Sequence, residues 1–147
     1  MKIAIGSDHG GFALKEDLIS YLNEKKIEII DCGCYTTERV DYPVFAKEVA
    51  KKVQNEEVTY GVLICTTGIG MSICANKYKK IRAALVTNSE SAHLTRQHNN
   101  SNIICLGAKF TTLDDAKEYV DIFLNETFMG ERHTNRVKMI EEAENER

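Results

Sequence analysis

The run Tyr60–Cys65 constrains the fold of this chain more than any other feature of its sequence. It is continuously apolar, and a glycine-rich turn that contains Gly68 and Gly70 follows it directly. A parallel strand that is covered on both faces has this pattern, whereas a half-exposed strand alternates apolar and polar residues. The run therefore predicts a central strand of a parallel sheet.

Short apolar runs alternate along the chain with stretches that carry apolar residues at helical spacing. The expected strands are Lys2–Gly6, Glu28–Asp31, Tyr60–Cys65, Ile81–Val86 and Ile103–Leu106. The expected helices are Phe12–Lys25, Pro43 to about Asn55, the glycine turn to about Lys77, Ser89 to about His98, and Thr112 to about Glu126. Such alternation implies right-handed crossovers between parallel strands. We expect an α/β fold: a single-domain, doubly wound, Rossmann-like five-stranded parallel sheet with a C-terminal helical arm.

The arm is the segment 129–147, where the composition changes. It is highly charged and carries only a thin apolar stripe of Val137, Ile140 and Ala143. A helix this polar is poorly held by one core. We therefore expect residues 1–128 to form the α/β core, and the arm to be either a contact with a partner subunit or a frayed surface helix.

Bulk properties exclude several classes of protein. A length of 147 residues suits one domain, and a net charge of -3 gives no reason to expect nucleic acid or a membrane as a partner. The amino terminus enters a strand without a signal peptide, and no apolar stretch approaches the roughly 20 residues that span a bilayer. The 5 cysteines, an odd and scattered set, indicate free thiols and a cytoplasmic location.

The sharpest candidate site follows the Tyr60–Cys65 strand, where residues 65–72 read Cys-Thr-Thr-Gly-Ile-Gly-Met-Ser. Ligands of open parallel sheets bind at the carboxyl ends of the strands. A thiol just before a glycine turn that opens a helix lies near outward-pointing backbone N–H groups, which favour a thiolate and can hold an anion. This pattern suits proton abstraction or nucleophilic attack, although a buried structural cysteine is the alternative.

Two further segments carry candidate chemistry. After the first strand, Asp8 and His9 lie in a glycine turn whose spacing does not match the dinucleotide fingerprint, so NAD binding is not expected. Asp8 is either an acid–base group or a helix cap. Arg132 and Arg136 share a helix face and either clamp one phosphate or form a solvated basic patch. His98 by itself reads as structural, and no metal site is proposed.

These segments together resemble a known family. The motifs are Ser-Asp-His-Gly-Gly at 7–11, Val-Asp-Tyr-Pro at 40–43, Cys-x-Thr-Gly-Ile-Gly-Met-Ser at 65–72, Ala-Asn-Lys at 75–77, Ile-Arg-Ala-Ala at 81–84, His-Asn-x-x-Asn at 98–102 and Gly-x-Arg-His-x-x-Arg at 130–136. In this order, over nearly the whole chain, they resemble the type B ribose-5-phosphate isomerases. The resemblance implies interconversion of ribose 5-phosphate and ribulose 5-phosphate, without a cofactor, in a homodimer with shared active sites.

The resemblance also implies roles for individual residues. Cys65 would be the base that moves the C2 proton, Asp8 and His98 would open the sugar ring and contact the sugar, and Thr67 would position its hydroxyl groups. The remaining expected substrate contacts are the turn Gly68, Ile69, Gly70, Met71 and Ser72, the sugar contacts Tyr42 and Asn99, and the phosphate contacts His9, Arg132 and Arg136.

This chain departs from the family pattern at a few positions. Thr66 stands where glycine is usual, Cys74 where alanine is usual, and Gln97 and Asn100 where acidic residues are more usual. These departures bear on substrate specificity more than on activity, and an isomerase of allose or galactose 6-phosphate is the nearest rival. A cysteine hydrolase or phosphatase is a weaker rival, because residues 66–72 contain no arginine. A non-catalytic sugar-phosphate sensor ranks lower still.

Overall fold

The computed structural model describes residues 1–146 and contains one five-stranded sheet in which every neighbouring pair of strands is parallel. The strand order is β2-β1-β3-β5-β4. The strands are β1 (Lys2–Ser7), β2 (Glu28–Asp31), β3 (Tyr60–Cys65), β4 (Ala83–Leu85) and β5 (Ile103–Gly107). The continuously apolar run is therefore the central strand, as its sequence predicts.

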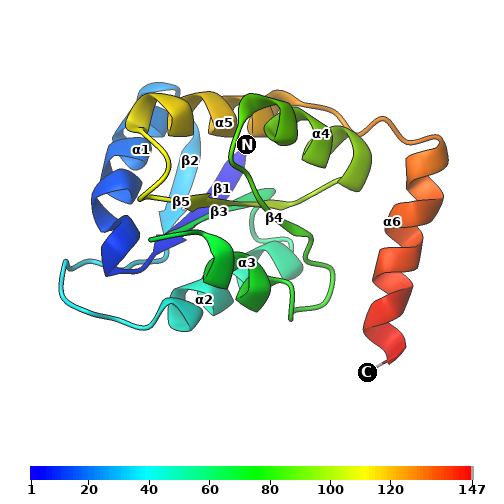
Figure 1. The fold of residues 1–147 in the computed structure, drawn as a ribbon, viewed down its shortest axis with the longest axis horizontal. Coiled ribbons are helices and arrows are strands. Elements are labelled where there is room, and N and C mark those ends of the chain that lie inside the picture. The colour runs from blue at the N-terminus through cyan, green and yellow to red at the C-terminus, as the bar shows by residue number, and fades with distance from the viewer. Residues whose placement is uncertain (147) are drawn as a thin grey trace.

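Helices cover both faces of this sheet, with α1, α4 and α5 on one face and α2 and α3 on the other (Figure 1). The helices are α1 (Phe12–Glu24), α2 (Tyr42–Gln54), α3 (Ile69–Ala75), α4 (Ser89–Asn99), α5 (Leu113–Asn125) and α6 (Arg132–Ala143), with short 3₁₀ turns η1 (His9–Gly11) and η2 (Glu144–Glu146). This arrangement confirms the doubly wound α/β fold. No helix within residues 1–146 is long and apolar enough to cross a membrane.

Successive side chains of each central strand enter different hydrophobic cores. Ile3 and Ile5 pack with α1 and α5, whereas Ala4, between them, packs with α2. In β3, Val62 belongs to the core on the α1 and α5 side and Leu63 to the core on the α2 side. All of these side chains are fully buried. Burying one large aliphatic side chain contributes about 1.5–3 kcal/mol. The two cores together hold the carboxyl ends of β1 and β3 in a defined place.

Strand β4 is shorter than the expected Ile81–Val86. The backbone N–H of Arg82 donates to the side-chain oxygen of Asn102 at 2.8 Å, so a side chain replaces the strand partner there. The ladder to β5 begins only at the next residue. Such side-chain competition for backbone groups is a common reason for strand ends to differ from the apolar pattern.

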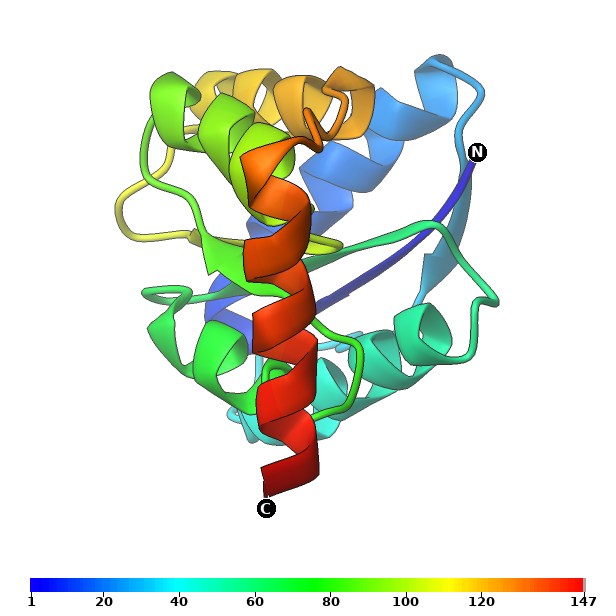
Figure 2. The same cartoon turned by 90° about the vertical axis from the view of Figure 1, so that its right-hand side faces the viewer.

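The arm forms a helix, α6, that stands beside the β4 edge of the sheet and runs from one helical layer toward the other (Figures 1 and 2). Only His133 and Val137 of this helix are buried. Near its end, Arg82 Nη1 donates to Glu141 Oε1 at 3.2 Å and the backbone N–H of Lys80 donates to Glu144 Oε1 at 2.7 Å. The expected helical arm is thus confirmed, and it touches its own subunit through a small number of contacts.

Candidate active site

A pocket of about 460 Å³ opens at the carboxyl ends of β1 and β3. It is lined by Asp8, Tyr42, Cys65, Thr66, Thr67, Ile69, Gly70 and Ile73. The fold therefore brings six of the sequence-derived site residues to one pocket, from the turn after β1, the start of α2, the end of β3, the turn that follows it and the first turn of α3. Ile73 lines the pocket as well and was missed, since one more apolar residue in a helix carries no distinctive signal.

The thiol of Cys65 lies at the tip of β3 with 4% of the residue exposed. The backbone N–H of Gly68 donates to its Sγ at 3.0 Å. The N–H groups of Gly70 and Met71, in the first turn of α3, have no acceptor among residues 1–146. A thiol at this place can act on a ligand as a base, and the two amides that remain free to donate can support the resulting oxyanion.

Gly68 makes this turn possible. Its φ of +77° lies in the left-handed region, and a Cβ there would lie 2.7 Å from Leu85 Cδ1 and 2.8 Å from the carbonyl carbon of Leu106. We expect Gly68→Ala to lower the free energy of unfolding by about 2–4 kcal/mol, because backbone strain and overpacking add. Denaturation in urea measures this loss.

Gly130 offers a matched control for that substitution. Its φ of +70° is similar, but the nearest atom to an added Cβ is Thr134 Oγ1 at 3.5 Å. Gly130→Ala should therefore cost only the strain of a left-handed alanine, about 1–2 kcal/mol. Equal losses in the two variants would show that steric overlap at Gly68 has no effect.

Asp8 caps a helical turn and also lines the pocket of Cys65. Its Oδ1 accepts the N–H of Gly11 at 3.1 Å and so caps the turn η1. The residue is 6% exposed and also lines the pocket of Cys65. Its own N–H donates to the carbonyl of Ile64 at 3.2 Å, which ties the carboxylate to the strand that carries Cys65. The cap therefore positions a carboxylate beside the thiol.

His9 lies in η1 but does not line this pocket. The backbone N–H of Val40 donates to its Nδ1 at 3.1 Å. Because an N–H can donate only to an unprotonated nitrogen, the ring carries its proton on Nε2 and can donate from there. The loop that contains Val40 thus orients a side chain that the family resemblance associates with phosphate.

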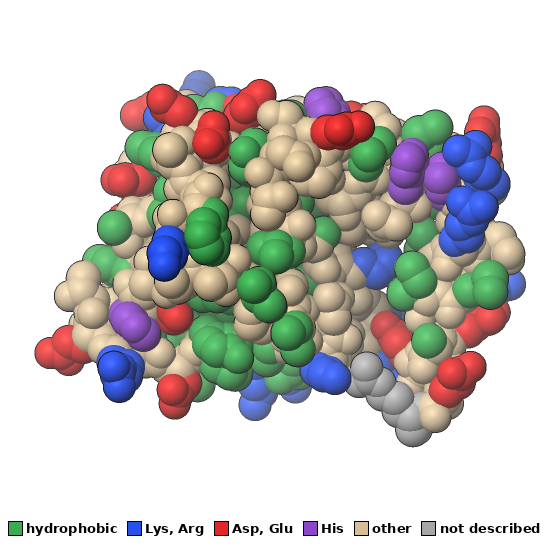
Figure 3. Space-filling view, in the orientation of Figure 1, with side chains coloured by type: hydrophobic (Ala, Val, Ile, Leu, Met, Phe, Trp, Pro, Cys, Tyr) green, Lys and Arg blue, Asp and Glu red, His purple; other side chains and the backbone are tan. Residues whose placement is uncertain are grey.

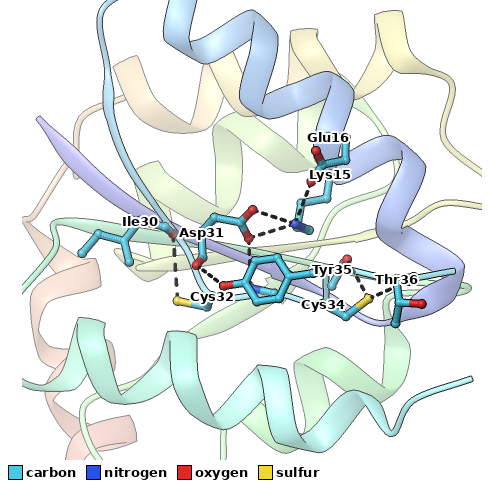
Figure 4. Close-up of polar contacts among 10 residues, drawn as sticks. Lys15, Glu16, Ile30, Asp31, Cys32, Cys34, Tyr35 and Thr36 are labelled. Carbon is cyan, nitrogen blue, oxygen red and sulfur yellow. Dashed lines mark hydrogen bonds and ion pairs between the residues drawn. The ribbon is translucent and has the colours of Figure 1, made fainter. Parts of the chain in front are cut away.

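The beginning of that loop is anchored by an ion pair between a buried lysine and a partly exposed aspartate (Figure 4). Lys15 Nζ, fully buried, donates to the two carboxylate oxygens of Asp31 at 2.8 and 2.9 Å. The same carboxylate accepts the N–H of Gly33 at 2.9 Å, and Tyr35 Oη donates to the Asp31 carbonyl at 2.8 Å. The sequence analysis did not predict this ion pair. A lysine directly beside the apolar positions of an amphipathic helix is nevertheless a sign that its side chain is buried and needs an acidic partner.

Four other expected site residues form a second cluster at the junction of α4 and α6. His98 and Asn99 end α4, and Arg132 and Arg136 lie in the first turns of α6. Figure 3 shows histidine and basic side chains gathered where α6 begins. None of these four residues lines the pocket of Cys65 in the same chain. The structure thus separates the expected site into two groups.

Comparison with known proteins identifies the family. Residues 3–140 match the family model described as Ribose/Galactose Isomerase. The chain is similar to ribose-5-phosphate isomerase B of Escherichia coli, with 44% identity over 99% of this chain and 98% of that protein. It is also similar to two solved structures of ribose-5-phosphate isomerase B. The structure from Clostridium thermocellum has a TM-score of 0.98 and 46% identity, with 99% of both chains covered. The structure from Mycoplasma genitalium, with bound ribulose-5-phosphate, has a TM-score of 0.95 and 40% identity over 99% of this chain and 97% of that one.

Proposed function

Because the chain belongs to the ribose/galactose isomerase family, we propose that it interconverts ribose 5-phosphate and ribulose 5-phosphate. The observation that carries this proposal is the thiol of Cys65, which accepts an amide N–H from Gly68 and faces a pocket lined by Asp8. A thiol base beside amide donors is what an enediolate mechanism requires. This chemistry needs no metal or organic cofactor.

The reaction begins with opening of the furanose ring. One group removes the proton from O1 of the sugar, and another returns a proton to the ring oxygen. We assign these steps to Asp8 and His98, because a carboxylate and an imidazole exchange protons readily near neutral pH. The open-chain aldehyde then lies with C1 and C2 at the thiol.

The isomerisation itself moves one proton between neighbouring carbons. The thiolate of Cys65 takes the proton from C2, which leaves an enediolate, and returns it to C1 while the hydroxyl proton passes from O2 to O1. The turn Gly68–Ser72 supplies amide donors, above all those of Gly70 and Met71, to the enediolate oxygens. Thr67, on the same turn, positions the sugar hydroxyl groups.

The rest of the substrate is held by its two polar ends. We assign the phosphate to Arg132, Arg136 and the Nε2–H of His9, because guanidinium groups bind phosphate through paired hydrogen bonds. Tyr42 and Asn99 are assigned to the sugar hydroxyl groups. Anchoring at the phosphate converts a loose encounter into a positioned reaction.

We further propose that each active site is shared by two subunits of a homodimer. Within one chain, His98, Asn99, Arg132 and Arg136 do not line the pocket that contains Cys65. A two-fold symmetric contact presents the same surfaces of both subunits to each other. It can therefore place the α4–α6 cluster of one subunit over the pocket of the other, twice in each dimer.

The surface supports this assembly. Between α6 and the body of the chain lies a cleft of about 420 Å³, and the space-filling view shows the hollow beside the arm (Figure 3). Its lining includes Ile81, Ala84 and Ile140. Ile69 and Ile73, at the rim of the Cys65 pocket, are 49% and 58% exposed. Exposed apolar side chains beside a hollow in the surface mark a protein interface. We propose that a second copy of the chain fills the cleft beside α6 and covers Ile69 and Ile73.

Subunit mixing tests the shared site and the activity together. The wild-type protein is expected to convert ribose 5-phosphate to ribulose 5-phosphate, measured by NMR of the sugar. Cys65→Ala and His98→Asn are each expected to be inactive. Co-expressed with different tags, the two variants should recover roughly a quarter of wild-type turnover, since half of randomly assorted dimers are mixed and each has one intact site.

The controls make this experiment decisive. Each variant mixed with itself should stay inactive, and purification through both tags should raise the recovered turnover toward half of the wild-type value, because every dimer is then mixed. Mixed dimers without activity would mean that Cys65 and His98 act within one chain. A wild-type protein that leaves ribose 5-phosphate unchanged would refute the proposed reaction itself.

The proposal also covers the number of carbon atoms in the substrate and the cellular location of the enzyme. The family description includes galactose isomerases, but the similar proteins named above are ribose-5-phosphate isomerases, so we propose a five-carbon substrate. The unusual Thr66 lines the pocket together with Asp8, and its Oγ1 lies close to Gly10. Because all 5 cysteines are free thiols, we propose that the enzyme works in the reducing cytoplasm.

A further inference from the structure

The cluster at the start of α6 contains a histidine that the proposed reaction does not use. His133 is 4% exposed, and its ring stacks on that of His98 with centroids 4.2 Å apart and planes inclined by 12°. Beside this stack, the backbone N–H of Met129 donates to the carbonyl of Gln97 at 3.0 Å. The stack and this hydrogen bond join the last turn of α4 to the first turn of α6.

The environment of His133 disfavours a charged ring. Its Nε2 is buried and has no hydrogen-bond partner among residues 1–146, so protonation would bury an unpaired cationic N–H. Burial, and then the charges of His98, Arg132 and Arg136, lower the pKa of His133, and the weaker attraction of Glu131 opposes this. The face turned toward His98 is therefore a flat ring on which a positive charge is disfavoured.

We propose that His133 is a positioning residue, which holds the imidazole of His98 in the orientation that exchanges protons with the sugar. The inference rests on the role of His98 in the proposed function. With one ring face covered, His98 cannot rotate freely, and its edge nitrogens remain available to a substrate. Since His133 shares a helix with Arg132 and Arg136, the stack also sets the spacing between phosphate contact and proton exchange.

Two substitutions separate stacking from the chemistry of the imidazole. His133→Phe keeps a flat neutral ring, and His133→Ala removes it. We expect kcat with ribose 5-phosphate to fall on the order of 10- to 100-fold in the alanine variant, because small misplacements of reacting groups are costly. The phenylalanine variant should retain most of kcat. KM should change less than kcat in both, because the phosphate contacts remain.

A spectroscopic measurement reports the stack without reference to turnover. The ring protons of His98, assigned by NMR with His98→Asn, should shift in His133→Ala and stay displaced by a neighbouring ring in His133→Phe. A purely structural role would instead raise KM and lower the melting temperature while leaving these signals in place. Equal loss of kcat in both variants, or unmoved His98 signals in His133→Ala, would overturn the proposal. A wild-type protein without isomerase activity would refute the proposed function, whereas the NMR signals would still test the stack.

Discussion

Cys65→Ser is expected to lower kcat for ribose 5-phosphate about 10³-fold or more, because a serine hydroxyl is a far weaker base than a thiolate. Serine Oγ can still accept the N–H of Gly68, which Cys65 Sγ accepts at 3.0 Å, so the turn should persist. KM should change little, since the phosphate contacts lie elsewhere in the proposed site. Turnover in both directions and circular dichroism of the purified variant provide the measurement.

Cys74 provides the matched control for this substitution. It is a half-buried free thiol of α3, close in sequence to Cys65 but outside the lining of its pocket. Burial raises the pKa of the Cys74 thiol, so less of it is present as the thiolate that could remove a proton. Cys74→Ala should therefore keep near-native turnover. Near-native turnover in Cys65→Ser would instead remove the thiol from the reaction and require another base, with Asp8 the nearest candidate in the pocket.

Asp31→Asn is expected to produce the largest loss of stability, about 3–5 kcal/mol, because it leaves a buried ammonium without its main counter-charge. Lys15 is fully buried, and Asp31 supplies both of its shortest contacts, at 2.8 and 2.9 Å. Only Glu16, at 3.0 Å and half exposed, would remain as a partner. Urea denaturation measures the change, and a raised KM should accompany it because the ion pair anchors the loop that orients His9.

The double variant Lys15→Met with Asp31→Asn separates an unpaired charge from a lost contact. Replacing both charged partners of a buried pair is often nearly neutral, so the double variant should recover much of the stability that Asp31→Asn loses. Glu57→Gln breaks the exposed pair of Lys52 and Glu57 and should cost no more than about 1 kcal/mol. A loss in Asp31→Asn no larger than that in Glu57→Gln would contradict the argument.

The same pair gives the direction of a pH effect. Burial lowers the pKa of the Lys15 ammonium, but the hydrogen bonds and charges of Asp31 and Glu16 outweigh it, so the net pKa is raised. The folded protein therefore holds this proton more tightly than the unfolded chain. The resulting stability is fully present below the ordinary lysine pKa and is lost as the pH rises through the higher folded value.

Local patterns determined most of the fold. The apolar run Tyr60–Cys65 is the central strand, and alternation of short apolar runs with helical stretches led to the correct α/β class. These predictions succeed because a strand buried on both faces must be apolar throughout. The first residue of β4 was predicted wrongly. The hydrogen bond from the Arg82 N–H to the Asn102 side chain shortens the strand at its start, and it joins residues that no local pattern connects.

The same distinction between local pattern and tertiary contact applies to the site. The motif at 65–72 indicated by itself a thiol beside amide donors, because both belong to one short turn. Only the tertiary structure could show that Asp8 and Tyr42 line one pocket with this thiol, that His98 stacks on His133, and that the two groups lie apart in one chain. Contacts between segments distant in sequence depend on how helices pack against the sheet and on which faces a partner covers. Those are properties of assembled surfaces, whereas strand and turn chemistry is already present in consecutive residues.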